Sequence, residues 1–202
     1  MIAIIDYGCG NLFSVSSSLK SLGIQSVITG DAEVIKAADK IILPGVGAFE
    51  DAVKKLRDTG HFELLKSLAD EGKKILGICL GMQLLFEKSY EYGVHEGLGL
   101  VPGSVKPLEG EIDRRLKIPH MGWNKLNITR NDDIFKYIKN GDYMYFVHSF
   151  YACCGEESLL ADTEYDISVP AVVKAGSVYG MQFHPEKSGA KGLELLHAFN
   201  EL

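Results

Sequence analysis

The first half of the chain alternates short apolar runs with segments of helical period. Residues 2–5 form an apolar run that predicts a buried strand, and the apolar positions after it share one face of a helix that Asn11 can cap and Gly23 can close. This alternation is typical of a parallel sheet covered by helices. Further strands are predicted at 25–29, 40–43 and 74–78, and further helices at 48–57, 62–68 and 80–87.

The second half has a different pattern, with short alternating segments separated by Gly, Pro and Asn. This pattern favours antiparallel strands. We expect strands at 123–129, 143–150, 171–175 and 178–183, and a closing helix at 189–199. No repeat or long linker interrupts the chain. The prediction is therefore an α/β fold, with a mixed, mostly parallel central sheet flanked by helices and antiparallel strands in the second half, in a single domain over residues 1–202.

Composition and charge exclude several classes of protein. Hydrophobic residues make up 46% of the chain and charged residues 24%, which is ordinary for a globular protein. The net charge of -6 gives no general attraction for nucleic acid or an anionic membrane. The N-terminus lacks the features of a signal peptide, and no apolar stretch approaches the roughly 20 residues needed to cross a bilayer. We therefore expect a cytoplasmic protein.

The most informative stretch is the G-x-C-x-G sequence from Gly77 to Gly81, centred on Cys79. It falls between a predicted strand and a predicted helix, which is the position of a nucleophile elbow, the tight turn that presents a nucleophile at a sheet edge. Such a turn needs flanking residues without Cβ, and a helix beginning at Leu80 would favour the thiolate. The alternative for this stretch alone is a buried cysteine in a glycine-rich turn.

Two other segments complete a candidate site. His184 and Glu186 follow the strand predicted at 178–183, so the imidazole is expected at the same sheet edge as Cys79, with the carboxylate holding it. Backbone N–H groups of the loop Gly45, Val46 and Gly47, together with Leu80, are candidates for stabilising an oxyanion. The alternative for the glycine loop is a tight turn between strand and helix.

The sequence gives no sign of a metal or a cofactor. The cysteines Cys9, Cys79, Cys153 and Cys154 show no paired CxxC spacing and are expected to be free thiols. The stretch 8–10 lacks the third glycine of a dinucleotide fingerprint, because position 13 is Phe.

The segment 77–83, taken with His184, Pro185 and Glu186, resembles the class I (triad) glutamine amidotransferases over essentially the whole chain. The resemblance implies that family's fold and a glutaminase reaction, in which Cys79 attacks glutamine, His184 carries the proton and Glu186 supports it. It also implies a set of residues around the bound glutamine, with Glu91 at its α-ammonium. The matching positions are Gln83, Glu91, Tyr145, His148 and Ser149.

Four further stretches (6–11, 44–49, 119–124 and 184–188) are similar to the amidotransferase subunits of imidazole glycerol phosphate synthases, which serve histidine biosynthesis. That resemblance implies a heterodimer with a (β/α)8-barrel cyclase subunit that receives the ammonia. It places Met121, Trp123 and Lys187 at the partner, and implies that the 45–47 backbone reorients when the partner binds its ligand. The alternative for Trp123 alone is a core aromatic.

Three other functions remain open at this point. The first is an amidotransferase subunit for another synthase, against which the stretch 119–124 weighs. The second is a cysteine peptidase or related hydrolase that shares the elbow. The third is a non-enzymatic module that retains glutamine recognition, against which the presence of all three triad residues weighs.

Overall fold

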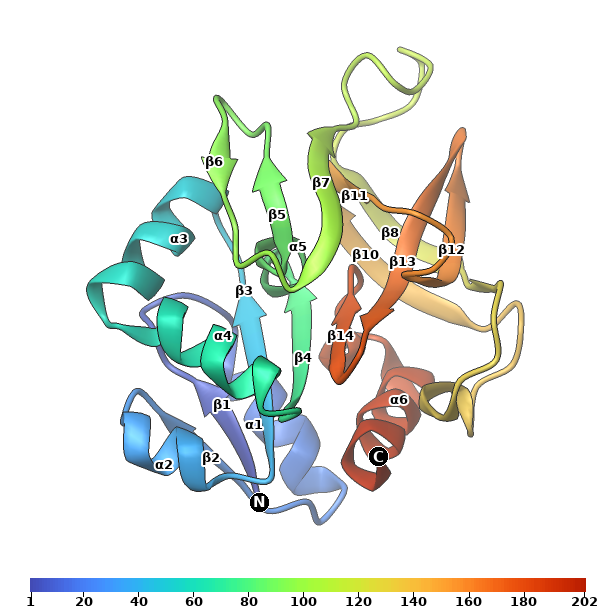
Figure 1. The fold of residues 1–202 in the computed structure, drawn as a ribbon. Coiled ribbons are helices and arrows are strands. Elements are labelled where there is room, and N and C mark those ends of the chain that lie inside the picture. The colour runs from blue at the N-terminus through green and yellow to red at the C-terminus, as the bar shows by residue number, and fades with distance from the viewer.

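An eight-stranded central sheet runs through the molecule in the order β2-β1-β3-β4-β14-β13-β12-β9, in a computed structural model that describes residues 1–202 (Figure 1). The five strands from β2 to β14 pair in parallel, and the remaining pairs are antiparallel. The sheet is mixed and mostly parallel, as predicted. Its strands are β1 (Ile2–Ile5), β2 (Ser26–Thr29), β3 (Lys40–Gly45), β4 (Lys74–Cys79), β9 (Asn127–Ile128), β12 (Leu159–Tyr165), β13 (Ile167–Ala175) and β14 (Val178–Met181).

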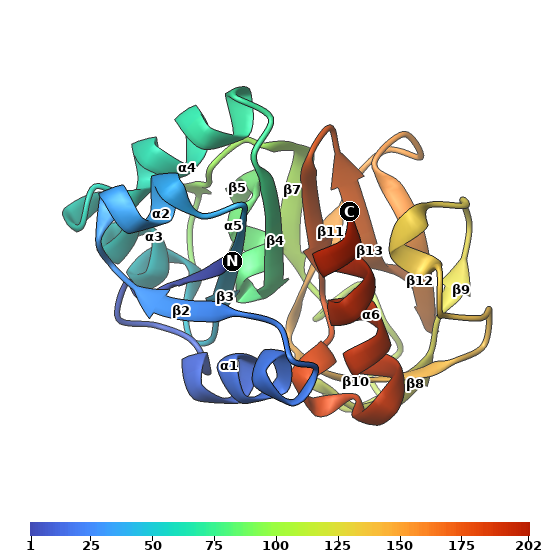
Figure 2. The ribbon, with the colours of Figure 1, turned by 90° about the horizontal axis from the view of Figure 1, so that it is seen from below.

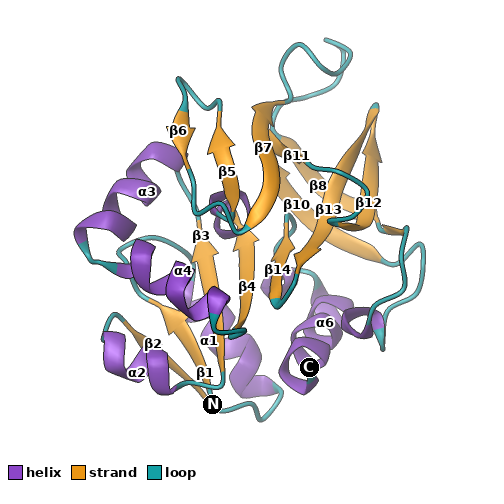
Figure 3. Cartoon of the chain, viewed as in Figure 1, coloured by secondary structure: helices purple, strands orange, loops and turns teal.

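Helices cover both faces of the parallel part of the sheet (Figures 2 and 3). Alternate residues of a strand point to opposite faces. Ile2 and Ile4 accordingly join the cluster that α1 and α6 cover, whereas Ala3 and Ile5 join the cluster beneath α2, α3 and α4. Burying both faces explains why these strands are apolar without alternation. The helices are α1 (Leu12–Ser21), α2 (Ala32–Ala37), α3 (Phe49–Asp58), α4 (His61–Asp70), α5 (Leu80–Leu84) and α6 (Gly189–Glu201).

Two smaller sheets stand beside the carboxyl edge of the parallel strands. One pairs β10 (Tyr143–His148) with β8 (His120–Lys125), and the other has the order β11-β7-β5-β6. The chain passes from β10 to β11 through Ser149 alone. This segment lies close to the end of β4, since the carbonyl oxygen of Val147 is 3.8 Å from Cys79 Sγ. The remaining elements are β5 (Phe86–Ser89), β6 (His95–Glu96), β7 (Val101–Pro107), β11 (Phe150–Cys153) and the 3-10 turns η1 (Asp133–Phe135) and η2 (Pro185–Lys187).

The helix predicted at 80–87 is too long. It ends at Leu84, and Phe86 begins the strand β5. The cause is a distant segment: Leu98 donates to the carbonyl of Leu84, and Leu100 donates to the carbonyl of Leu85. Carbonyls engaged in this way by the 97–101 segment are not available to continue the helix.

Other boundaries also differ from the prediction. Asn11 precedes α1 but makes no side-chain capping hydrogen bond. The strand predicted at 123–129 is instead β8 followed by β9, and the strand predicted at 143–150 ends at His148. The pattern missed the short helix α2, which Asp31 caps by accepting from the backbone of Glu33 and Val34. It also missed the strands β6, β7, β11 and β12.

Candidate active site

Cys79 occupies a strained turn between β4 and α5. Its φ of 55° and ψ of -113° are rarely adopted by a residue with a side chain. A Cβ at Gly77 would lie 2.6 Å from the carbonyl oxygen of Gly81, and one at Gly81 would lie 1.9 Å from that of Leu43. The flanking glycines are therefore required by close backbone approach, which is the geometry expected of a nucleophile elbow.

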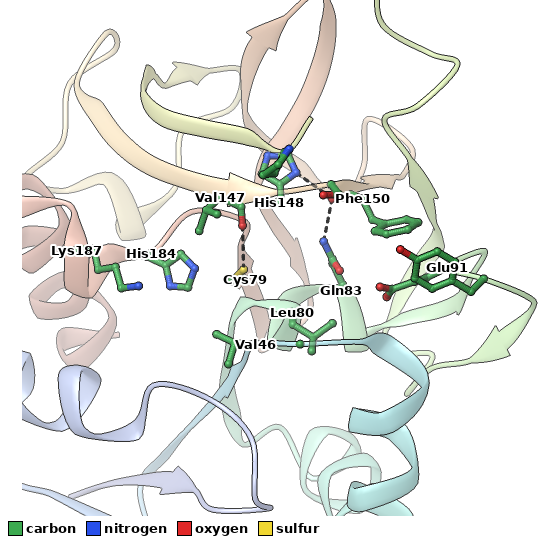
Figure 4. Close-up of a pocket in the computed structure, with 14 residues that line it drawn as sticks. Val46, Cys79, Leu80, Gln83, Glu91, Val147, His148, Phe150, His184 and Lys187 are labelled. Carbon is green, nitrogen blue, oxygen red and sulfur yellow. Dashed lines mark hydrogen bonds between the residues drawn. The ribbon is translucent and has the colours of Figure 1, made fainter. Parts of the chain in front are cut away.

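His184 and Glu186 meet Cys79 at the edge of the central sheet. Strand β14 is the parallel neighbour of β4, so the chain that leaves β14 brings His184 beside the elbow (Figure 4). His184 Nδ1 lies 2.8 Å from Glu186 Oε1, with both side chains almost fully buried. Because a carboxylate only accepts, the Nδ1 nitrogen carries a proton, and Nε2 is left for Cys79.

The protonation of His184 depends on both neighbours. Burial alone would lower its pKa, but hydrogen bonding and charge from Cys79 and Glu186 outweigh burial and raise the pKa to about 9. The imidazolium form is consequently present at neutral pH. A cation beside a sulfur is one of the arrangements that favour a reactive thiolate.

Substitution of Glu186 with glutamine should lower the pKa of His184 and reduce ammonia release from glutamine about 10⁴-fold, the loss seen when the acid of a serine protease triad is neutralised. The pKa is higher in the folded chain than the unfolded value of 6.5. The stabilisation of the folded state by the His184 imidazolium is therefore complete below about pH 6.5 and is lost as the pH rises through about 9. Glu186→Gln should weaken this pH dependence, measured by chemical denaturation and by NMR titration of His184.

The surface pair His197 and Glu201 supplies the control, since their side chains approach to 3.4 Å in partly exposed positions. Glu201→Gln should leave the titration of His184 and the glutaminase rate unchanged. An unaltered pKa of His184 in Glu186→Gln would contradict the assigned contact.

A cavity of about 390 Å³ opens beside Cys79 and His184. Its volume falls within the usual range for small-molecule sites, roughly 300 to 1,000 Å³. Most of the residues predicted from the sequence line it (Figure 4). They are Val46, Gly47, Leu80, Gln83, Glu91, His148, Ser149 and Lys187.

The glycine loop divides into a packed part and an accessible part. Gly45 does not line the cavity, and a Cβ there would lie 2.7 Å from Gly81 N and 3.0 Å from the hydroxyl of Tyr7. Val46 and Gly47 do line it, and their N–H groups donate no hydrogen bond within the chain. The free donors of the loop are thus at Val46 and Gly47, whereas Gly45 provides space for the elbow.

Glu91 is held by the start of a helix. Its carboxylate accepts a hydrogen bond of 2.8 Å from the backbone of Phe49, the first residue of α3, and burial raises its pKa. One buried carboxylate in the cavity is suited to an ammonium group.

Tyr145 was predicted to line the same pocket and does not. Its side chain lies against Trp123, with ring centroids 6.1 Å apart, because the two residues stand directly opposite each other in the antiparallel pair of β10 and β8. Its backbone instead holds the histidine loop: its carbonyl accepts from His184 N at 2.9 Å and its N–H donates to Ser188 Oγ at 2.9 Å.

The three residues predicted to face a partner lie at the surface. Met121 and Trp123 are 61% and 55% exposed on β8, so Trp123 is not a core aromatic. Lys187 is exposed at the rim of the cavity.

Other lining residues were not identified from the sequence. They are Tyr92, Pro119, Val147 and Phe150, of which Val147 has its carbonyl oxygen 3.8 Å from Cys79 Sγ. Three of them, Tyr92, Val147 and Phe150, follow or precede a predicted residue directly in the sequence, and Pro119 lies in the stretch 119–124. A search of the positions next to each predicted residue could have found them. The structure contains no cluster of three or more His, Cys, Asp or Glu residues able to hold a metal ion, and no helix with the length and hydropathy of a membrane span. All four cysteines are free thiols, as predicted.

The family of the chain follows from its sequence as well as its geometry. A family model described as "Glutamine amidotransferase class-I" matches residues 3–201. The chain therefore belongs to the class-I glutamine amidotransferases, and it is an enzyme.

Within that family, the chain is 50% identical over 202 residues to the imidazole glycerol phosphate synthase subunit HisH of Listeria monocytogenes serotype 4a, covering 100% of this chain and 96% of that protein. It is 52% identical to the HisH subunit of Caldanaerobacter subterraneus subsp. tengcongensis, with 100% and 98% covered. These matches confirm the subfamily resemblance predicted from the motifs.

Solved structures with lower identity share the fold. A glutamine amidotransferase crystal structure aligns with a TM-score of 0.78 at 20% identity, covering 100% of this chain and 98% of that chain. The PurLQS structure from Thermotoga maritima aligns with a TM-score of 0.73 at 20% identity, covering 99% and 97%. The class I glutamine amidotransferase-like fold predicted from the sequence is confirmed.

Proposed function

We propose that this chain is the glutaminase subunit of an imidazole glycerol phosphate synthase and supplies ammonia for histidine biosynthesis. The observation that carries the proposal is the arrangement of His184 between Cys79 and a buried Glu186, at a cavity that also contains the Glu91 carboxylate. Glutamine has two groups that match this cavity. Its carboxamide can be attacked by the sulfur of Cys79, and its α-ammonium can pair with the carboxylate of Glu91. The identity to HisH subunits supports the choice of synthase.

The proposed reaction uses each group in turn. The Cys79 thiolate attacks the carboxamide carbon and forms a C–S bond, and the negative charge on the carbonyl oxygen is stabilised by N–H groups of the 46–47 loop and Leu80. His184 Nε2–H then protonates the leaving nitrogen, so the C–N bond breaks and ammonia departs. Water, deprotonated by His184, hydrolyses the glutamyl thioester to glutamate and restores the sulfur.

Exposed residues on β8 and at the rim of the cavity support a separate cyclase subunit. Ammonia is nucleophilic only when neutral, and in bulk water at neutral pH most of it is protonated. Transfer through a sheltered path into an adjoining (β/α)8-barrel would avoid this loss. The exposed Met121 and Trp123 and the rim residue Lys187 are suited to that contact.

Reconstitution with the cyclase subunit tests the proposal. Glutamine should yield glutamate and should support formation of imidazole glycerol phosphate, with faster glutaminase turnover when the cyclase holds its own ligand, since the 45–47 backbone is proposed to reorient then. Cleavage of peptides in place of glutamine would favour a cysteine peptidase. Activity only with a different synthase would favour another amidotransferase subunit.

Trp123→Ala should weaken binding of the cyclase by about 30- to 1,000-fold, the range of about 2 to 4 kcal/mol typical of an exposed aromatic at the centre of an interface. Because the side chain is 55% exposed, the free energy of unfolding should change little. The control variant is Ile28→Ala. It truncates a hydrophobic side chain that is 38% exposed on β2, an edge strand of the central sheet. Calorimetric titration should give equal affinities for Ile28→Ala and the wild type, and an unchanged affinity for Trp123→Ala would remove it from the interface.

A further inference from the structure

A chain of hydrogen bonds, buried at its centre, connects strand β8 to the wall of the glutamine cavity. Its centre is the carbonyl oxygen of Phe150, which lies 2.9 Å from Gln83 Nε2 and 2.9 Å from His148 Nδ1 (Figure 4). A carbonyl oxygen accepts and never donates. Gln83 must therefore present its amide nitrogen to Phe150, and His148 must carry its proton on Nδ1.

The tautomer of His148 fixes the next histidine. With Nδ1 protonated, neutral His148 has an acceptor at Nε2, and this nitrogen lies 2.9 Å from His120 Nδ1. His120 is consequently the donor, with its own Nε2 as an acceptor. The amide nitrogen of Asn124 lies 3.3 Å from that Nε2 and supplies the donor.

The amide of Asn124 is fixed by the backbone. Its nitrogen also donates to the carbonyl of Glu164 at 2.8 Å, and its oxygen accepts from the N–H of Lys125 at 2.8 Å. Every bond in the chain thus has one direction, set at both ends by main-chain groups that cannot reverse. Burial lowers the pKa of His120 to about 4 and, together with the charge of His120, that of His148 to about 3, so both are neutral near pH 7.

At the cavity, the same directionality determines which atom of Gln83 meets the substrate. The amide nitrogen of Gln83 donates a second hydrogen bond, of 3.0 Å, to Gln182 Oε1. Both of its protons are then used within the protein. Its Oε1 makes no hydrogen bond in the chain and is the atom left for the cavity that Gln83 lines.

We propose that His120 is a positioning residue for glutamine binding. By donating from Nδ1 it holds His148 in the Nδ1–H tautomer, which keeps Phe150 and Gln83 in place and aims the Gln83 amide oxygen at an N–H donor of glutamine. In the opposite tautomer, the lone pair of His148 Nδ1 would face the Phe150 carbonyl and displace it. The inference rests on the proposed glutaminase function, and it gives His120 no contact with substrate.

Two substitutions of His120 separate this role from packing. His120→Phe retains a ring that can stack on Tyr165 and Phe146, whose ring centroids lie 4.0 and 5.0 Å from that of His120, but it has no donor. His120→Asn loses the ring but places an amide nitrogen near the position of Nδ1. In complex with the cyclase, His120→Phe should raise KM for glutamine about tenfold, the effect of about 1.4 kcal/mol, with kcat changed less than about threefold. His120→Asn should restore KM to within about threefold of the wild type.

Thr163→Val is the matched control, because Thr163 is fully buried on neighbouring β12 and its hydroxyl has no hydrogen-bond partner. It should leave KM unchanged. An unchanged KM in His120→Phe would overturn the proposal, as would an increase in His120→Asn as large as that in His120→Phe.

NMR of the wild-type chain labelled with ¹⁵N in its imidazoles gives a second test that needs no variant and no activity. His120 and His148 are both expected as neutral imidazoles in the Nδ1–H tautomer. Because their pKa values are about 4 and 3, their ¹⁵N chemical shifts should stay constant between pH 6 and 8. A His148 signal in the Nε2–H tautomer would overturn the proposal. Absence of glutaminase activity in the wild type would refute the proposed function alone, since the tautomers would still be observed.

Discussion

Cys79→Ala should abolish ammonia release from glutamine, while its complex with the cyclase subunit continues to form product from added ammonium salt. Loss of a triad nucleophile reduces turnover by about 10⁶-fold in serine proteases, and no neighbouring group can replace the sulfur here. The substitution removes one atom at a site that is only 7% exposed, so the fold and the partner surface should persist. Parallel assays with glutamine and with ammonium salt measure the two half-reactions.

Cys154→Ala is the control for this prediction. Cys154 is a free, partly buried thiol whose pKa is raised to about 11 by burial, followed by the charges of Cys153 and Glu157, and it does not line the glutamine cavity. Both half-reactions should survive in this variant. Glutamine-dependent synthesis by Cys79→Ala would show that another residue is the nucleophile, and loss of synthesis from ammonium salt as well would show that the change disrupts the complex.

Two rules predict where the sequence places Cys79 and His184, and only the first depends on short-range geometry. A strand, a tight turn and a helix are contiguous in sequence around Cys79, so the G-x-C-x-G spacing contains the whole elbow, including its two close backbone contacts at Gly77 and Gly81. The position of His184 follows from a rule of topology, that parallel strands deliver the residues after them to one edge of the sheet. That rule holds because β14 is the direct neighbour of β4.

The wall of the cavity opposite Cys79 follows no such rule. It is built where β10 and β11 belong to different small sheets, and the partner of β11 is β7, a strand more than 40 residues earlier in the chain. A different contact, the hydrogen bonds from the 97–101 segment to the carbonyls of Leu84 and Leu85, ends α5 at Leu84, which hydropathy alone extended to 87. Residues whose position depends on pairing of this kind, such as Phe150 and Tyr92, were not predicted.

The hydrogen-bond chain through His120 could not be predicted from the sequence, because it also depends on strand pairing. Hydropathy treats His120 and His148 as two polar positions on separate strands, and only the antiparallel register of β8 and β10, which sets them opposite each other, reveals a pair. The resemblance placed His148 at the glutamine pocket and did not single out His120. The three-dimensional pairing thus adds a positioning residue to a segment whose neighbours Met121 and Trp123 were assigned to the partner.

The second large effect is expected at Gly81, where alanine should destabilise the fold by at least about 3 kcal/mol, the upper range for an overpacked core. In an ordinary helix, alanine in place of glycine would stabilise by about 1 kcal/mol. Here the new Cβ would lie 1.9 Å from the carbonyl oxygen of Leu43, so either α5 or β3 must move. Because α5 carries Leu80 and Gln83, a shift of about 1 Å should also reduce glutaminase turnover about 10²-fold in the molecules that remain folded.

Gly141→Ala distinguishes this close contact from the general cost of replacing a glycine. Gly141 has a φ of +91°, but no atom lies within 4 Å of a Cβ built on it, so alanine there should cost only the backbone strain, about 1 to 2 kcal/mol. Urea unfolding of both variants, with the midpoint and slope fitted separately, measures the two costs. Equal losses would mean that Leu43 and Gly81 can separate easily, and the elbow would then be a flexible turn instead of a rigid support for the nucleophile.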